Sequence, residues 1–266
     1  MNINANINDK TINQTFYAPR FRQYALAQWR EKKRAYCWHF AILIMIYFLI
    51  LLMINNGYST EEQCIVYYIG LVSTGFIFSL RYFSSLAKPE SGLIELMQPV
   101  STLEKWLLSV FIIMIAYPVI YSLLFVTMTV PVHWFTMATL SEYSDPSMYQ
   151  LFIPLQDISK NITALGQIPL WALFLGCNSY ALTTSIFFKR LPIIKSIALG
   201  FIIFLVFLLL AIAVEPDVDD LVKYWFDSKT YRLHTRAVIL NILWWIVAPV
   251  LMFVASFFAL KGRDLV

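Results

Sequence analysis

The sequence predicts an all-helical, polytopic membrane protein that crosses the bilayer six times. Two observations carry this prediction. First, 59% of the 266 residues are hydrophobic and only 14% are charged, whereas a soluble domain carries about 25% charged residues. Second, the apolar residues form continuous runs close to the roughly 20 residues that span a bilayer as a helix. A membrane β-barrel would instead show segments of about ten residues with alternating polarity.

The expected spans are the six apolar runs that end at polar or turn-forming residues. Their approximate limits are 38–55, 64–84, 106–130, 166–187, 196–214 and 237–260. If the N-terminus is cytoplasmic, most of the 20 Lys and Arg residues fall on the inner side. Because Lys and Arg are concentrated in cytoplasmic segments, we expect both termini to face the cytoplasm. Pro118 and Pro249 are expected to kink the third and sixth spans, since proline lacks a backbone donor.

The whole chain, 1–266, is predicted to form a single transmembrane domain. The expected parts outside the spans are a cytoplasmic tail with an interfacial helix (1–36), a cytoplasmic loop (88–105) and two long extracytoplasmic loops (131–165 and 215–236).

An amphipathic helix is expected at about 16–36, before the first span. Phe21, Tyr24 and Trp29 recur at helical spacing, and basic residues lie between them. Such a pattern is typical of a helix that lies in the membrane interface, with aromatic side chains at the acyl boundary. The alternative is a solvated basic tail that only sets the topology.

Motifs for chemistry within the chain are missing. The sequence contains no GxxxxGK[ST] phosphate loop and no HExxH zinc motif, and its three histidines are far apart. We therefore expect no catalytic residue, no metal site and no cofactor in this chain. The cores of the spans carry essentially no Asp, Glu, Lys or Arg, although ion-driven transporters place such residues there. The energy for any transport is thus expected to enter from outside the membrane.

Mildly polar residues occur within the second and fourth spans. The candidates for a substrate path are Ser73, Thr74, Asn178 and Thr183. The alternative role of such small polar residues is to pack and hydrogen-bond neighbouring helices.

The polar segment 88–106 separates the second and third spans. Its residues Ser101 to Glu104 predict a capping box, in which each side chain accepts a hydrogen bond from the other residue's backbone. Residues 91–98 are expected to form a short helix with an apolar face, which Pro99 ends. Trp106 follows, at the level where aromatic residues mark the membrane surface.

The run from Leu96 to Trp106, LMQPVSTLEKW, resembles the Leu-Met-Leu-Pro-x-Ser-x-x-Glu-Lys-Phe stretch of permease subunits in type-2 ATP-binding-cassette exporters, especially small bacterial ones. The order of interfacial helix, six spans and inner loop is also similar. Gln98 departs from the apolar residue that is usual in that family. The resemblance implies a permease in the bacterial inner membrane.

The resemblance also implies partners. The inner loop would carry a coupling helix, 88–98, that docks on a separate ATPase subunit, and ATP and Mg would bind in that partner. The implied docking residues are Leu93, Ile94, Glu95, Leu96, Met97 and Arg190. Two permeases, identical or different, would enclose the substrate path. No nucleic-acid partner is expected.

Three functions remain open from the sequence. The first is the exporter permease just described, which has no ATPase activity of its own. The second is a non-transporting scaffold or assembly subunit of a membrane complex, which would use the outer loops. For the segment 88–106 itself, the alternative is an ordinary capped loop with no docking role. The third is an intramembrane enzyme, for which the chain lacks convergent catalytic residues.

Overall fold

The computed structural model describes residues 16–53, 59–83, 100–139, 150–154, 167–188, 192–214 and 243–264. The helices in these ranges are α2 (Ala18–Met53), α3 (Thr60–Tyr82), α5 (Thr102–Phe111), α6 (Tyr117–Thr139), α7 (Gln167–Phe187), α8 (Pro192–Val214) and α11 (Ala248–Asp264). Two π-helical turns, η3 (Ile112–Ala116) and η5 (Leu243–Val247), precede α6 and α11. The described part of the chain is therefore all-helical, as the sequence predicts.

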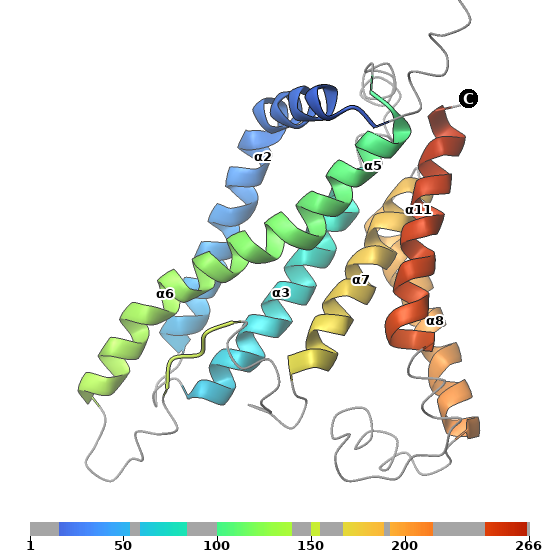
Figure 1. Cartoon of the computed structure of the whole chain (residues 1–266). Helices are drawn as coiled ribbons and strands as arrows, with labels where there is room; N and C mark the ends of the chain where they lie inside the picture. Colours follow the sequence, from blue (N-terminus) through green and yellow to red (C-terminus); the bar gives the residue numbers. More distant parts are fainter. Residues whose placement is uncertain are drawn as a thin grey trace, which may run out of the picture.

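Figure 1 shows the helices as an elongated bundle, with the start of α2, the start of α5 and the end of α11 near one end. Helix α7 packs most extensively against α3 and α11. The N-terminal part of α2 lies across that end of the bundle before the helix turns to run along it. The sequence predicts a separate interfacial helix and a span that begins at 38, but the structure joins them in one continuous helix.

Helix α3 illustrates why these segments form and pack as they do. Ser59 caps its N-terminus, accepting from the amide of Glu62, while the Glu62 carboxylate accepts from the amide of Ser59. The residues buried along α3 recur every three or four positions, which is the helical repeat. They include Cys64, Tyr67, Tyr68, Leu71, Gly75, Phe78 and Tyr82. This stripe forms much of the hydrophobic core together with aromatic residues of α6 and α7.

The two prolines expected to kink spans each follow a π-helical turn. The turn η3 ends at Ala116, just before Pro118, and η5 ends at Val247, just before Pro249. A proline removes one backbone donor and crowds the preceding turn, and a wider π turn is a common way for a helix to absorb such a disturbance.

The third span is longer than the sequence predicts. Its helix continues through Pro131 to Thr139, so the outer loop expected at 131–165 does not begin at 131. Residues 132–139 remain helical because a proline disturbs mainly the turn before it. The predicted end of this helix at Pro131 is therefore wrong.

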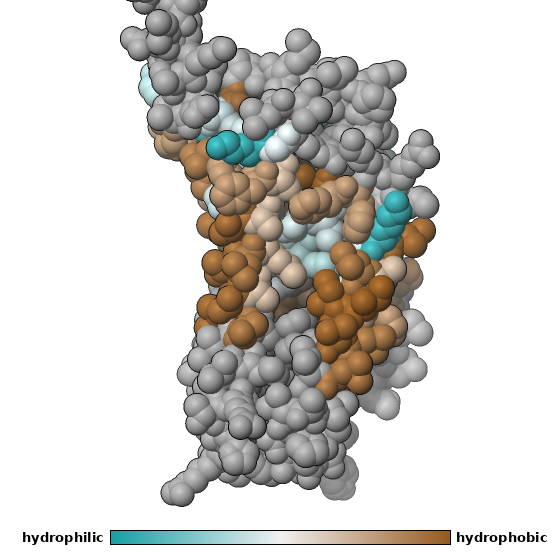
Figure 2. All heavy atoms as spheres, turned by 90° about the vertical axis from the view of Figure 1, so that its right-hand side faces the viewer, coloured by the Kyte–Doolittle hydropathy of each residue, from teal (hydrophilic) through white to brown (hydrophobic). Residues whose placement is uncertain are grey.

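Four helices within the described residues are long and apolar enough to cross a membrane: Ala18–Ile50, Thr60–Tyr82, Thr102–Phe135 and Leu170–Phe187. Two further apolar stretches, Ile194–Val206 and Ala248–Gly262, are shorter in the described part. Large hydrophobic side chains of α2, α6, α8 and α11 lie exposed on the outside, and Figure 2 shows hydrophobic side chains over the described middle of one face. The chain is thus a helical membrane protein.

The short segment 150–154 is bound to the start of α3. The Gln63 side chain accepts from the amide of Phe152 at 2.9 Å and donates to the carbonyl of Gln150 at 3.3 Å, and Thr60 donates to the same carbonyl at 2.8 Å. Phe152 is buried against the rings of Tyr67 and Tyr68. The segment therefore closes this end of the aromatic core.

Replacing Gln63 with alanine is expected to release the segment 150–154. The buried amide of Phe152 would lose its acceptor, which costs about 1–3 kcal/mol. Hydrogen exchange followed by mass spectrometry should show faster exchange across 150–154. The matched control is Glu61→Ala, which alters a neighbouring exposed side chain outside the capping box and should leave this exchange unchanged. Equal protection in both variants would contradict the anchoring role of Gln63.

Candidate functional site

The start of α5 holds a buried carboxylate. Ser101 caps the helix by accepting from the amide of Glu104 at 3.3 Å, and the Glu104 carboxylate accepts from the amide of Ser101 at 3.1 Å. This reciprocal pair is the capping box that the sequence predicts. Glu104 is fully buried, whereas a capping-box glutamate at a solvated helix end can remain exposed. Its charge must therefore be compensated by partners from elsewhere in the chain.

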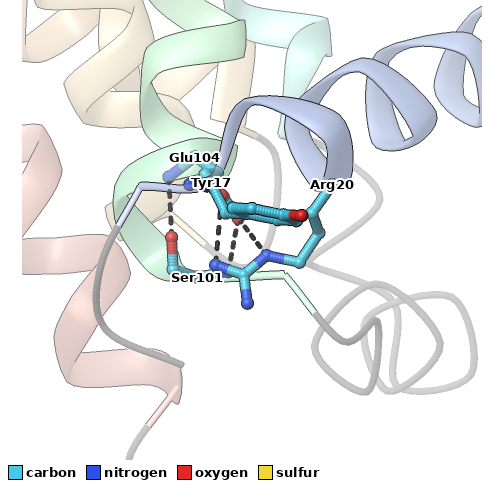
Figure 3. A network of polar contacts seen from close by, with 4 residues as sticks. All are labelled: Tyr17, Arg20, Ser101 and Glu104. Atoms are coloured by element: carbon cyan, nitrogen blue, oxygen red, sulfur yellow. Dashed lines mark hydrogen bonds and ion pairs between the residues drawn. The ribbon is translucent and has the colours of Figure 1, made fainter. Parts of the chain in front are cut away.

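The compensating partners come from the N-terminal end of α2. Arg20 donates from Nε to Oε2 of Glu104 at 2.9 Å and from Nη2 to Oε1 at 3.1 Å. The amide of Tyr17 donates to the same Oε1 at 2.8 Å. Figure 3 shows these groups converging on Glu104. We call Tyr17, Arg20, Ser101 and Glu104 the α2–α5 clamp.

The geometry of the clamp makes it strong. Two parallel bonds from one guanidinium to one carboxylate form a bidentate pair, which is stronger and more directional than a single ionic contact. Each carboxylate oxygen receives two donors, because Tyr17 and Ser101 supply the remaining bonds. The carboxylate also lies at the first turn of α2, where the helix dipole favours negative charge. Its oxygens are occupied, so Glu104 is suited to joining segments rather than to accepting a proton in catalysis.

A second contact joins α5 to α11. The indole Nε1 of Trp106 donates to Ser256 Oγ at 2.9 Å, and the Trp106 ring meets Phe257 edge-on. The indole of Trp106, which the sequence places at the level of the membrane surface, therefore also binds a neighbouring helix. The start of α5 is thus tied to the N-terminal helix on one side and to the C-terminal helix on another.

The predicted docking residues lie outside the described residues. These are Leu93, Ile94, Glu95, Leu96 and Met97 of the predicted coupling helix, and Arg190 of the second inner loop. The next described residue is Val100, directly before the Ser101 cap. The clamp therefore lies at the point where the segment 88–98 joins the third span.

The four candidates for a substrate path do not come together. Asn178 is buried between α7 and α3, where it accepts from Ser79 Oγ at 2.6 Å and donates to the carbonyl of Phe174 at 2.8 Å. Thr183 donates to the carbonyl of Met252 in α11 at 2.8 Å. Both side chains bond neighbouring helices, as small polar residues in membrane helices commonly do. These bonds favour the alternative role of Asn178 and Thr183, which is to join neighbouring helices.

Ser73 and Thr74 lie in a different place, a groove of about 230 Å³ between α2, α3 and α6. The groove is otherwise lined mainly by apolar side chains, such as Leu43 and Met128. Ser73 donates to the carbonyl of Ile69 at 2.6 Å. This bond to the helix backbone satisfies the Ser73 hydroxyl, so the groove offers few polar groups to a ligand.

Thr74 ends a short polar chain inside the bundle. Tyr117 donates to Thr74 Oγ1 at 2.7 Å, and His39 Nε2 lies 3.4 Å from the same tyrosine oxygen. The His39 ring packs against Phe40 and Phe78. His39 therefore joins α2 to α6. Among the described residues, no three His, Cys, Asp or Glu side chains are grouped as metal ligands would be.

The three aromatic residues of the predicted interfacial helix do not share one face. Tyr24 is buried with 6% of its surface exposed, whereas Trp29 is 53% exposed. They are five positions apart, which places them about 140° apart around a helix. Phe21 is half-buried and its ring contacts Phe16. The prediction of a single aromatic stripe toward lipid is therefore wrong, since Tyr24 faces the protein.

Sequence reasoning missed Arg20 and Tyr17 as partners of Glu104. A signal existed, because a glutamate in a capping box beside an apolar run needs a cation if it is buried. However, the segment 20–34 offers several basic residues, and only the folded chain selects Arg20. Comparison of the chain with protein families, curated proteins and solved structures finds no match.

Proposed function

We propose that this chain is the permease subunit of an ATP-binding-cassette exporter in the bacterial inner membrane. It would cross the membrane six times with both termini in the cytoplasm and would form a dimer with an identical or different permease. A separate ATPase subunit, holding ATP and Mg, would drive it. The proposal includes no catalytic residue in this chain.

The α2–α5 clamp is the observation that best supports this function. In the proposed transporter, the ATPase pushes on the segment 88–98, and the push must enter the membrane helices without being absorbed by a soft joint. The bidentate Arg20–Glu104 pair and the Trp106–Ser256 bond stiffen that junction. A displacement of 88–98 would thereby move α2, α5 and α11 together.

Two further features are consistent with the proposal. The resemblance in residues 96–106 indicates the class of partner, and the uncharged span cores leave no group to sense a driving ion. The start of α2 and the end of α11 lie near one end of the bundle (Figure 1), as expected for two termini on the same side of the membrane.

Replacing Leu93 and Ile94 together with aspartate is expected to detach the ATPase. Two apolar side chains at the centre of a docking surface would become charged, and such central contacts carry most of the binding energy. We expect the amount of ATPase that co-purifies with the tagged chain to fall at least about tenfold, equivalent to 1.4 kcal/mol. Quantitative mass spectrometry of the complex in nanodiscs measures this ratio.

The matched control is Ile162→Asp with Leu165→Asp, which makes the same change of charge in the predicted outer loop. It should retain the ATPase. If the unaltered chain captures no ATPase in either gentle detergent or nanodiscs, the permease proposal is wrong and a scaffold role gains support. ATP-dependent movement of a substrate in reconstituted vesicles would exclude the scaffold role.

A further inference from the structure

A second and larger groove, of about 430 Å³, lies between α7, α8 and α11. Its walls are mostly apolar and include Phe204, Pro249 and Met252. Gly176 of α7 and Gly200 of α8 also line the groove, and they widen it because they lack side chains. Figure 2 views this side of the molecule and shows two groups of hydrophobic side chains separated by paler, less hydrophobic surface. The volume is in the range of about 300–1,000 Å³ typical of sites for small molecules.

One polar group in the groove lacks a partner. Ser196 lines the groove and is fully buried, and its Oγ makes no hydrogen bond with the described residues. The backbone carbonyl of Ser196 is occupied, since it accepts from the Tyr180 hydroxyl at 2.6 Å. A buried hydroxyl without a partner is costly, so a bound molecule that offers an acceptor here would be favoured.

A basic residue precedes Ser196 in α8. Lys195 is exposed near the start of α8, and its Nζ lies 6.0 Å from the ring centroid of Phe188, just beyond the end of α7. From Ser196 to Phe204 the groove follows about 12 Å of helix, close to the roughly 15 Å depth of one leaflet's hydrocarbon. Along α8, the cation, the hydroxyl and the groove-lining residues therefore follow one another in the order of a phospholipid's phosphate, ester and acyl chain.

We propose that this groove binds an anionic glycerophospholipid of the surrounding leaflet. The phosphate would lie at Lys195, an ester carbonyl would accept from Ser196 Oγ, and one acyl chain would lie along α8 between α7 and α11. An apolar helix from a second copy would cover the groove but leave the Ser196 hydroxyl unpaired. The proposal requires only that the chain spans a membrane, and it does not rest on the transport function.

The test uses the full chain in nanodiscs that contain phosphatidylglycerol with a photoreactive diazirine in one acyl chain. Mass spectrometry then maps the labelled peptides. We expect labelling within 173–180 and 196–204, and about fivefold less labelling with the matching zwitterionic phosphatidylcholine probe, because one lysine near the surface contributes about that factor.

Three variants test the parts of the site. Lys195→Gln should abolish the preference for the anionic probe, whereas Lys261→Gln should keep it. Ser196→Ala should reduce groove labelling about fivefold through one lost hydrogen bond. Gly176→Leu should reduce it about tenfold by filling the space of about two methylene groups. An added Cβ at Gly176 would meet only Pro249, at 3.8 Å, so the first added carbon displaces no neighbour.

Gly262→Leu is the matched control for groove filling, because an added Cβ at Gly262 meets nothing within 4 Å. It should leave groove labelling unchanged. Equal labelling by both probes, unaffected by Lys195→Gln, would overturn the proposal. So would efficient disulfide formation between two copies of an Ile197→Cys variant with no labelling of the groove, since a second copy would then occupy it.

Discussion

Replacing Glu104 with alanine is expected to lower the free energy of unfolding by about 3–5 kcal/mol, the usual cost of breaking a buried ion pair. Arg20 would lose both ionic bonds, and the amides of Tyr17 and Ser101 would lose their acceptor. Unfolding of the purified chain by a denaturing detergent, followed by tryptophan fluorescence, measures the loss. A double-mutant cycle with Arg20→Ala gives the coupling between the two side chains.

The other capping box in the described chain provides the control. Ser59 and Glu62 make the same reciprocal hydrogen bonds at the start of α3, but those bonds are exposed. Glu62→Ala should therefore cost only about 1 kcal/mol, the value of a typical cap. If the two glutamate variants lose the same free energy, the Arg20 pair adds nothing to the cap and the clamp does not stiffen the junction.

Replacing Gly75 with leucine is expected to destabilise the bundle by about 3 kcal/mol, at the upper end of the usual cost of overpacking a core. A Cβ at this position would lie 3.0 Å from the Phe174 ring and 3.2 Å from Asn178 Oδ1. Helices α3 and α7 would have to separate, which would also disturb the Ser79–Asn178 hydrogen bond. The same detergent-unfolding measurement detects the change.

The steric origin of this loss has its own test. Gly262→Leu adds the same side chain where nothing lies within 4 Å, and it should change the free energy of unfolding by no more than about 0.5 kcal/mol. Adding Phe174→Ala to Gly75→Leu should recover part of the loss, because the removed ring makes room. Strictly additive losses in the double variant would show that the two side chains do not compete for the same space.

Patterns within a few residues were predictable from the sequence. The Ser101–Glu104 capping box was predicted because both of its hydrogen bonds join residues three positions apart. The apolar runs were predicted as helices because a backbone in lipid must satisfy its own polar groups. A kink at Pro118 was predicted because proline lacks a backbone donor, whereas the π turn that precedes it was not predicted.

Choices between distant partners were not predictable. Asn178 and Thr183 have the same local pattern whether they line a path or bond another helix, and only the position of α3 and α11 decides. The placement of Tyr24 and Trp29 depended on how α2 meets the bundle. A single apolar or polar residue in a helix carries no information about which neighbour it will meet.

By itself, the sequence determined that the chain is a helical membrane protein and where most of its helices run, because hydrophobic run length and end-capping are local properties. Only the tertiary structure decided that Arg20, 84 positions away, neutralises Glu104 and that Ser196 is left without a partner. Both outcomes depend on which donor and acceptor atoms of different helices come within about 3 Å of each other, and the packing of the whole bundle sets those distances.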